Sequence, residues 1–204
     1  MSPGLALVVL AAGASARLGE PKALVRLRPG AGGTALELLL AAGAVLEDPR
    51  PLVVTGADHD AIARAAPSGV EVCLNEGWSA GRTGSVQRAA ALRPGRDLCL
   101  APVDVPLVPA LVFAALWAEW EESGLPERGW LAPFILEAGA RRFGHPVILG
   151  RELAAALKAF PPQRPLHELR AHASPLLGLA VRSASVLDDL DTPADLLRLR
   201  ARPT

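Results

Sequence analysis

A short apolar run that leads directly into a loop of small residues constrains this chain more than any other feature. Residues 5–12 (LALVVLAA) are too few to cross a membrane and are typical of a buried parallel strand. The run breaks at Gly13, and two cations, Arg17 and Lys22, follow it. Small residues let a ligand approach the backbone closely, and the free N–H groups of such a loop bind anions. The stretch therefore predicts a nucleotide-binding loop.

The spacing of this loop excludes two better-known classes of nucleotide site. A P-loop requires Gly-Lys-Ser/Thr at its end, but position 18 is Leu and Lys22 is followed by Ala23. A dinucleotide fingerprint requires glycines where this chain has Ser15 and Leu18. A dinucleotide-dependent oxidoreductase also needs an acidic residue after its second strand, about 20 residues beyond the loop, and Asp58 lies much too far along the chain.

Strand and helix patterns alternate along the 204 residues, which predicts one α/β domain over residues 1–204. Its sheet is expected to be mostly parallel and covered on both faces. Thr192, Pro193 and Asp195 suit the N-cap, N1 and N3 positions of a final helix. The predicted strands cover residues 5–12, 52–56, 70–74, 97–101, 130–136, 147–149 and 176–181; the other predicted helices cover 34–46, 58–66, 86–92, 109–123 and 153–160, and residues 137–144 form a turn.

The charge balance favours a small-molecule partner over nucleic acid or a membrane surface. Lys and Arg together number 21, as do Asp and Glu, so no net field attracts an anionic polymer. No apolar run is long enough for a transmembrane helix, and no Lys or Arg precedes residues 5–12 as a secretory signal requires. We therefore expect a cytoplasmic protein. Cys73 and Cys99 lie in strand-like runs and are expected to pack in the core, and the cysteine and histidine spacing shows no zinc pattern.

Two later stretches carry residues suited to phosphate and metal binding. Residues 75–85 bring hydroxyls and glycines to the start of a helix, where they either attract an anion or simply cap the helix. Asp104 follows the strand at 97–101, and Pro106 favours an extended conformation for the residue before it. Ligands gather at the carboxyl ends of such strands, and a single carboxylate suits Mg²⁺. A turn-forming Asp between prolines is the alternative.

Residues 10–22 contain every defined position of the signature L-A-A-G-x-S-x-R-x-G-x-x-K. The chain thereby resembles the nucleotidyltransferases with a glycosyltransferase-A-like fold, above all the molybdenum-cofactor cytidylyltransferase and guanylyltransferase group with its MobA-like NTP transferase domain. The resemblance implies a three-layer α/β/α, Rossmann-like nucleotide-diphospho-sugar transferase fold with a mostly parallel mixed sheet. It implies that the nucleotide is bound by Leu10, Ala11, Ala12, Gly13, Ser15, Arg17 and Lys22.

The same resemblance covers four later segments. The pattern Asn-x-x-Trp-x-x-Gly-x-x-x-Ser is similar to the family's second nucleotide loop, and Asp-x-Pro is similar to the element that holds the catalytic metal. Gly-His-Pro is similar to a segment near the acceptor. The run Asp-x-Asp-Thr-Pro is similar to a terminal element that completes the metal site. The residues so implied are Asn75, Gly81 and Ser85 for the nucleotide; Asp104 with Asp189 or Asp191 for Mg²⁺; and Gly144, His145 and Pro146 for the acceptor.

The reaction implied is attack by a substrate phosphate on the α-phosphorus of a nucleoside triphosphate, with release of pyrophosphate. A phosphate nucleophile is already anionic at neutral pH, so catalysis would rest on alignment and on charge neutralisation by Mg²⁺, Arg17 and Lys22. Arg17, Lys22 and Asp104 are the expected catalytic residues. CTP is the favoured donor, because cytidylyltransferase-like members carry Ala at the position of Ala12, where guanylyltransferase-like members usually carry Gly.

The acceptor is less constrained than the donor. Members that act on molybdopterin usually carry a G-D-x-G-x-R type segment after Gly-His-Pro, and the equivalent residues 161–170 (PPQRPLHELR) lack the glycines. A sugar phosphate or another alcohol phosphate therefore stays open beside molybdopterin. A non-catalytic nucleotide-binding accessory protein is a further alternative, and the sequence leaves the oligomeric state open.

Overall fold

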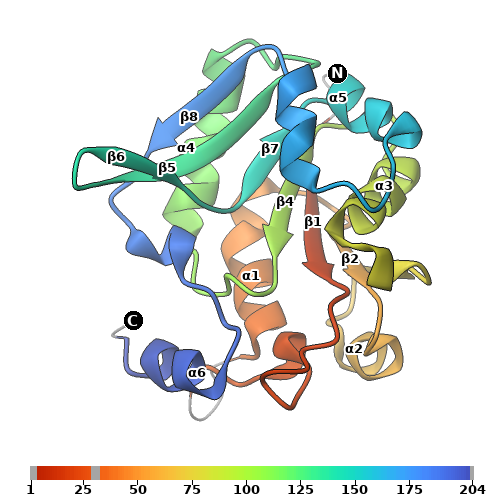
Figure 1. Cartoon of the computed structure of the whole chain (residues 1–204), viewed down its shortest axis with the longest axis vertical. Helices are drawn as coiled ribbons and strands as arrows, with labels where there is room; N and C mark the ends of the chain where they lie inside the picture. The colour runs from red at the N-terminus through yellow and green to blue at the C-terminus, as the bar shows by residue number, and fades with distance from the viewer. Residues whose placement is uncertain (1–3, 29–32, 203–204) are drawn as a thin grey trace.

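The computed structural model describes residues 4–28 and 33–202, in which the strands form one mixed sheet with helices on both faces (Figure 1). The strands are β1 (Ala6–Ala11), β2 (Leu52–Thr55), β3 (Glu71–Leu74), β4 (Leu98–Pro102), β5 (Trp130–Glu137), β6 (Ala140–Phe143), β7 (Val147–Leu149) and β8 (Leu176–Ala180). Their order in the eight-stranded sheet is β3-β2-β1-β4-β7-β5-β6, and β8 pairs with β5. The first four strands are parallel to one another, whereas β7 is antiparallel to β4 and β5.

The helices divide between the two faces of this sheet. The α-helices are α1 (Ala35–Gly43), α2 (His59–Ala65), α3 (Arg82–Leu92), α4 (Ala110–Glu122), α5 (Arg151–Ala156) and α6 (Pro193–Arg200). Short 3-10 helices are η1 (Lys22–Leu24), η2 (Ala44–Leu46), η3 (Trp78–Ala80), η4 (Leu157–Ala159), η5 (Leu166–His172) and η6 (Ala184–Leu187). Buried side chains of α1 and α4 pack in the core on one face, and those of α3 and α5 pack in a second core on the other. The predicted three-layer α/β/α architecture with a mostly parallel mixed sheet is confirmed.

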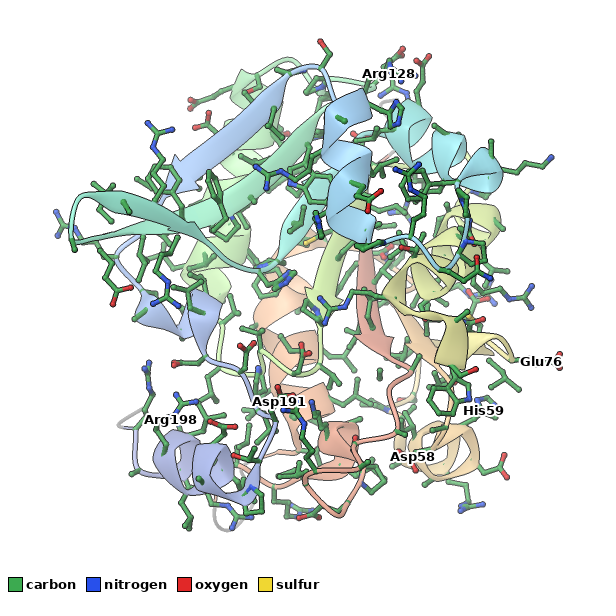
Figure 2. The ribbon with its side chains drawn as sticks, viewed as in Figure 1. Asp58, His59, Glu76, Arg128, Asp191 and Arg198 are labelled. Atoms are coloured by element: carbon green, nitrogen blue, oxygen red, sulfur yellow. The ribbon has the colours of Figure 1, made fainter. Side chains whose placement is uncertain are left out.

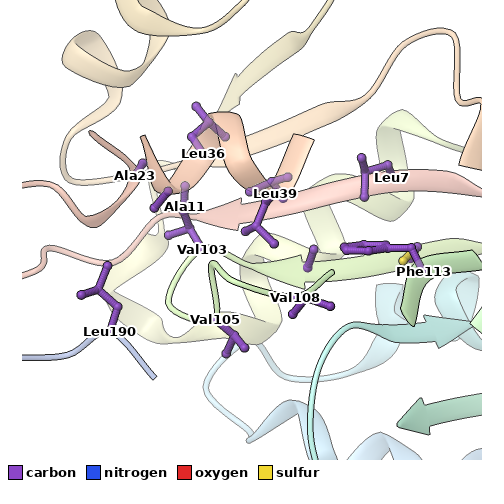
Figure 3. Packing of buried hydrophobic residues seen from close by; sticks show 14 of the residues in the cluster. Leu7, Ala11, Ala23, Leu36, Leu39, Val103, Val105, Val108, Phe113 and Leu190 are labelled. Carbon is purple, nitrogen blue, oxygen red and sulfur yellow. The ribbon is translucent and has the colours of Figure 1, made fainter. Parts of the chain in front are cut away.

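β1 lies at the centre of the parallel half of the sheet, and all six of its residues are buried. Leu7 and Val9 pack in the core with α1 and α4, where Figure 3 shows Leu7 near Phe113. Ala6 and Val8 pack in the core with α3 and α5. A strand covered on both faces needs apolar residues at every position rather than at alternate ones. This double burial explains the unbroken apolar run in the sequence.

Two predicted segments differ most from the structure. The helix expected at residues 86–92 begins at Arg82, because Gly81 (φ +127°) ends the preceding turn; the glycine at position 84 lowers helix propensity and hid this first turn. The segment 137–144, expected to be a turn, continues β5 to Glu137 and contains β6, whose four residues are all exposed. A strand exposed on both faces lacks the alternation by which strands are recognised.

The expected packing of the two cysteines in the core is confirmed. Cys73 and Cys99 are both buried and carry no disulfide. Among residues 4–28 and 33–202, no helix has both the length and the apolar character that a membrane crossing requires.

The C-terminal segment is attached to the core through Leu190, Leu196 and Leu199, all of which are buried with the residues of α1 and α4. The backbone N–H of Leu190 donates to the carbonyl oxygen of Asp104 at 2.7 Å. Leu190 is buried, whereas the flanking Asp189 is exposed and Asp191 is half-buried. The C-terminal segment is thereby held beside the end of β4.

Removal of the cap of α6 is expected to lower the stability of the protein by about 1 kcal/mol. The Thr192 hydroxyl accepts from the Asp195 N–H at 3.2 Å, and the Asp195 carboxylate accepts from the Thr192 N–H at 2.9 Å. Urea unfolding of Thr192→Ala against wild type measures the difference, with Thr192→Ser as the variant that keeps the hydroxyl. A hydrogen bond from the Thr192 hydroxyl, at 2.8 Å, and one from Arg198 lower the pKa of Asp195 from 3.8 to about 2. The stabilising contribution of Asp195 is therefore present above about pH 4 and is lost as the pH falls toward 2. Equal stability of Thr192→Ala and wild type at pH 7 would contradict this role.

Candidate active site

The carboxyl ends of β1 and β4 point toward the end of the molecule where η1 and α6 lie (Figure 1). The loops that follow these strands enclose a cleft of about 290 Å³. Parallel strands deliver their following loops to one edge of a sheet, which explains why stretches remote in sequence meet here. The lining residues are Leu10, Ala11, Ala12, Gly13, Ser15, Lys22, Ala23, Asp58, Ile62, Trp78, Ser79, Gly81, Arg82, Ser85, Pro102, Val103 and Asp104.

The loop after β1 is shaped around Ser15, which has a positive φ of 51°. Its carbonyl oxygen accepts from the N–H groups of Leu18 and Gly19 at 3.0 and 3.2 Å. Its hydroxyl oxygen accepts from the backbone N–H of Lys22 at 3.0 Å. Ser15 therefore closes the loop on itself and fixes the backbone of Lys22 at the edge of the cleft.

Lys22 and Arg17 both bind Asp191, which comes from the far end of the chain. Figure 2 shows Asp191 on the segment that leads into α6. A nitrogen of the Arg17 guanidinium lies 2.7 Å from one carboxylate oxygen, and the Lys22 ammonium binds the other. The Lys22 side chain is 16% exposed and that of Arg17 is 70% exposed. The hydrogen bond from Lys22 and the charge of Arg17 hold the pKa of Asp191 below its ordinary value. The two predicted phosphate-binding cations thus converge on a single anionic group.

The second predicted loop is held together by Asn75. Its side-chain amide donates to the Ser85 hydroxyl at 3.0 Å, and its side-chain oxygen accepts from the Gly77 N–H at 3.1 Å. Gly81 and Ser85 line the cleft, whereas Asn75 supports the loop from outside the lining. Asn75 and Ser85 therefore fix the shape of this wall of the cleft.

Asp104 reaches the cleft from the turn after β4 and is paired with Arg82 at 3.1 Å. The pair joins the Asp104 Oδ2 atom to the first residue of α3. The other oxygen, Oδ1, is buried and has no hydrogen-bond partner within the part of the chain that the structure describes. A buried carboxylate oxygen without a partner is costly unless a cation or another donor reaches it.

Asp189 lies near enough to Asp104 and Asp191 for their negative charges to affect its ionisation. Burial and these two neighbouring carboxylates raise the pKa of Asp189 above its ordinary value. A divalent cation at this position would offset the repulsion among the neighbouring carboxylates. It would also supply a partner for the buried Oδ1 atom of Asp104. The described residues hold no ready-made group of three or more acidic, histidine or cysteine metal ligands. Asp104, with its partnerless oxygen, and the neighbouring Asp189 are carboxylates that could contribute to a metal site.

A second cavity of about 320 Å³ adjoins the cleft and shares Leu10, Arg82 and Pro102 with it. His145 lines this cavity, while Gly144 and Pro146 do not. Gly144 instead serves packing, because a Cβ at this position would lie 2.3 Å from the carbonyl oxygen of Val186. The lining residues are Leu10, Arg82, Leu100, Pro102, Trp130, His145, Val147, Pro165, Leu166 and His167.

The imidazole of His145 is held neutral at physiological pH. Burial, with the positive charge of Arg82, lowers the pKa of its ring from 6.5 to about 4. Its Nδ1 atom is buried and makes no hydrogen bond within the described residues. The neutral ring can therefore donate or accept one hydrogen bond to a ligand in the second cavity.

The stability of the protein is expected to fall as the pH decreases from about 6.5 to about 4. In this range the His145 ring binds a proton in the unfolded chain but stays neutral in the folded protein. The free energy of unfolding, measured by urea titration between about pH 7 and pH 4.5, should fall less steeply in His145→Gln. The exposed His172 provides the matched control, and His172→Gln should retain the wild-type slope. Identical slopes in His145→Gln and wild type would contradict a neutral buried ring.

Sequence reasoning did not assign Arg82, Trp78, Trp130 or His167 to the site, although all four line a cavity. Two of the four had a usable signal: Trp78 belongs to the pattern Asn-x-x-Trp-x-x-Gly-x-x-x-Ser, and Arg82 is a cation between two glycines at a helix start. Arg17, Asp189 and Asp191 were predicted for the site but do not line the cleft themselves; Asp191 reaches it through its ion pair with Lys22.

Solved structures share this fold over nearly the whole chain. The crystal structure of Rv0371c from Mycobacterium tuberculosis H37Rv is 24% identical, covers 99% of this chain and 100% of its own, and has a TM-score of 0.78. Another structure of Rv0371c, at 22% identity with 99% and 100% coverage and a TM-score of 0.73, is a complex with manganese. Molybdopterin-guanine dinucleotide biosynthesis protein A from Archaeoglobus fulgidus is 18% identical, with 95% and 96% coverage and a TM-score of 0.71.

A further structure with the same fold is 2-C-methyl-D-erythritol 4-phosphate cytidylyltransferase from Thermus thermophilus, which is 19% identical, with 96% and 97% coverage and a TM-score of 0.69. No curated protein matched the sequence. Residues 7–176 match the family described as the MobA-like NTP transferase domain. Together with the shared fold, this match establishes that the chain belongs to the MobA-like NTP transferase domain family.

Proposed function

We propose that this chain is a Mg²⁺-dependent nucleotidyltransferase that moves a nucleoside monophosphate, CMP by preference, from its triphosphate to a phosphorylated acceptor. Membership of the MobA-like family supports the general activity of nucleotidyl transfer. The observation that carries the proposal is the convergence of Lys22 and Arg17 on one carboxylate at the mouth of the cleft. Two cations that share an anion in the free protein are positioned to bind an anionic ligand in its place.

The triphosphate of the donor is bound by Lys22 and Arg17, and the loop at Gly13 holds the base. Asp191 would give way to the phosphates, because a triphosphate offers more negative charge to the two cations than one carboxylate does. Ala12 lines the cleft, and its methyl group narrows the space for a purine, which favours CTP. An acceptor phosphate oxygen attacks the α-phosphorus, the bond from that phosphorus to the bridging oxygen breaks, and the electron pair leaves with pyrophosphate.

A metal would be held by Asp104, with Asp189 as the second carboxylate. The partnerless Oδ1 of Asp104 and the raised pKa of Asp189, to which the neighbouring Asp104 contributes, support this pair. A divalent cation bound here would offset charge on the phosphate oxygens in the transition state. Manganese in the Rv0371c complex supports a divalent cation in this fold, and Mg²⁺ is the ion we propose for this chain.

The acceptor is proposed to enter the second cavity, near His145. Molybdopterin is one candidate, supported by the family and by the Archaeoglobus protein with the same fold. A sugar phosphate or another alcohol phosphate is the second candidate, supported by the erythritol-phosphate cytidylyltransferase fold and by the missing glycines at residues 161–170.

A pyrophosphate-release screen tests the proposed function. Each common nucleoside triphosphate is combined with a panel of phosphorylated acceptors, with and without Mg²⁺. Release that depends on Mg²⁺, on an acceptor and most strongly on CTP is the expected result. Calorimetric binding of CTP that needs no Mg²⁺, without release under any combination, would instead identify a nucleotide-binding accessory protein.

A further inference from the structure

The guanidinium of Arg82 stands in the wall between the cleft and the second cavity. Within the described residues, only Leu10 and Pro102 share both linings with it, and both are apolar. Arg82 is therefore the charged side chain common to the two cavities. Its side chain is 45% exposed, so a ligand can reach it.

We propose that Arg82 binds the phosphate group of the acceptor at the opening between the two cavities, while an apolar or aromatic acceptor body occupies the second cavity. The inference rests on the proposed function, because it assigns the two reactants of a nucleotidyl transfer to adjacent spaces. It adds a phosphate-binding residue and narrows the chemical class of the acceptor.

The geometry of the Arg82 guanidinium suits a phosphate. A guanidinium offers several N–H groups in a planar fork that matches the oxygens of a phosphate or a carboxylate. In the free protein an oxyanion already lies against it, since the Asp104 Oδ2 atom is 3.1 Å from its Nη2. A phosphate monoester that enters the opening would compete with Asp104 for this guanidinium.

The second cavity suits an acceptor body with few hydroxyl groups. Leu100, Trp130, Val147 and Leu166 contribute apolar surface, and the neutral His145 ring adds no charge. A polyhydroxylated sugar would bury more hydroxyls here than the side chains of His145 and His167 can pair, and burial of unpaired hydroxyls is unfavourable. An aromatic or aliphatic body makes favourable contact with the same surface.

The wall of this cavity is a built feature of the fold. Pro165, Leu166 and His167 belong to the segment that departs from the family pattern in sequence. This segment is attached to α3, because the Thr83 hydroxyl donates to the carbonyl oxygen of Arg164 at 2.6 Å. Thr83, the residue next to Arg82, therefore holds this wall of the second cavity in position. Residues 161–170, which differ from the family pattern, thus lie where an acceptor other than molybdopterin would be recognised.

Calorimetry with two probes tests the assignment. Phenyl phosphate represents the acceptor, and the non-reactive α,β-methylene analogue of CTP, with Mg²⁺, represents the donor. Wild type is expected to bind both at once, with the affinity for the analogue unchanged by saturating phenyl phosphate. Arg82→Gln is expected to weaken phenyl phosphate binding at least about tenfold and to change binding of the analogue less than about threefold.

Three variants control the measurement. Arg88→Gln lies on the same helix and lines neither cavity, so it should leave both affinities unchanged. Arg82→Lys keeps the charge and should retain part of the affinity for phenyl phosphate. Asp104→Asn removes the carboxylate that competes for Arg82, so it should strengthen phenyl phosphate binding while it weakens binding of the analogue with Mg²⁺.

The outcomes separate this inference from the proposed function. No binding of phenyl phosphate to wild type, equal binding to wild type and Arg82→Gln, or competition between the two probes would each overturn the role of Arg82. Loss of both phenyl phosphate and analogue binding in Asp104→Asn would also overturn the role of Arg82, because the Arg82–Asp104 ion pair would then serve to hold the fold of the site together. Failure of wild type to bind the analogue, with phenyl phosphate binding still dependent on Arg82, would overturn the donor assignment and support the phosphate-binding role.

Discussion

Replacement of Asp104 by Asn is expected to slow Mg²⁺-dependent nucleotidyl transfer by at least about 100-fold. The substitution keeps the size of the side chain and removes the charge that would hold the cation. The Oδ1 atom of Asp104 is buried without a hydrogen-bond partner in the described residues, so nothing else there uses this oxygen. The measurement is the initial rate of pyrophosphate release with CTP and the acceptor found in the screen, at increasing Mg²⁺ concentrations.

Asp60→Asn is the matched control for Asp104→Asn. Asp60 is an exposed carboxylate in the first turn of α2 and does not line the cleft, so its loss should leave the rate unchanged. Circular dichroism and urea unfolding of both variants separate loss of charge from loss of fold. A rate in Asp104→Asn within about threefold of wild type at every Mg²⁺ concentration would exclude Asp104 as a metal ligand.

The Lys22→Ala enzyme is expected to lose more than about tenfold in turnover, because the substitution removes a charge aimed at the phosphates in the transition state. Lys22 is well placed for this role, since its backbone N–H is fixed by Ser15 and its ammonium already binds an anionic group. Turnover and KM for CTP, both measured by pyrophosphate release, show whether the charge acts in the transition state or in ground-state binding.

Lys158 supplies the comparison for Lys22. It is exposed, lies in η4 and lines neither cavity, so Lys158→Ala should keep wild-type turnover and KM. Pyrophosphate release by Lys22→Ala at the wild-type rate would remove Lys22 from the catalytic residues. A rise in KM alone, with turnover unchanged, would restrict it to binding of the nucleotide.

Local sequence predicted most of the fold because the central parallel strands β1, β2 and β4 are buried on both faces and therefore consist of apolar runs. β1, β2 and β4 were recognisable for this reason, and the cap of α6 was recognisable because Thr192 and Asp195 act within one helical turn. β6 was missed because all of its residues are exposed, so neither burial nor alternation marks it. Prediction failed where a segment makes few contacts with the core.

The sequence by itself determined the donor side of the candidate site. The loop after β1, its two cations and Asp104 lie at strand ends, and parallel strands bring such ends to one edge of the sheet. Only the tertiary structure decided that Asp191 binds Lys22 and Arg17 and that Asp189 lies close to Asp104. Both arrangements depend on burial of Leu190 against a core built from distant segments.

The tertiary structure also decided the position of Arg82. In sequence Arg82 is one of several polar residues at a helix start, and nothing there relates it to Asp104 or to the second cavity. Because α3 packs against the sheet and against residues 161–172, the Arg82 side chain lies between the cleft and the second cavity. Spacing along the chain encodes local structure and the order of strands, whereas contacts between remote side chains depend on how the layers pack.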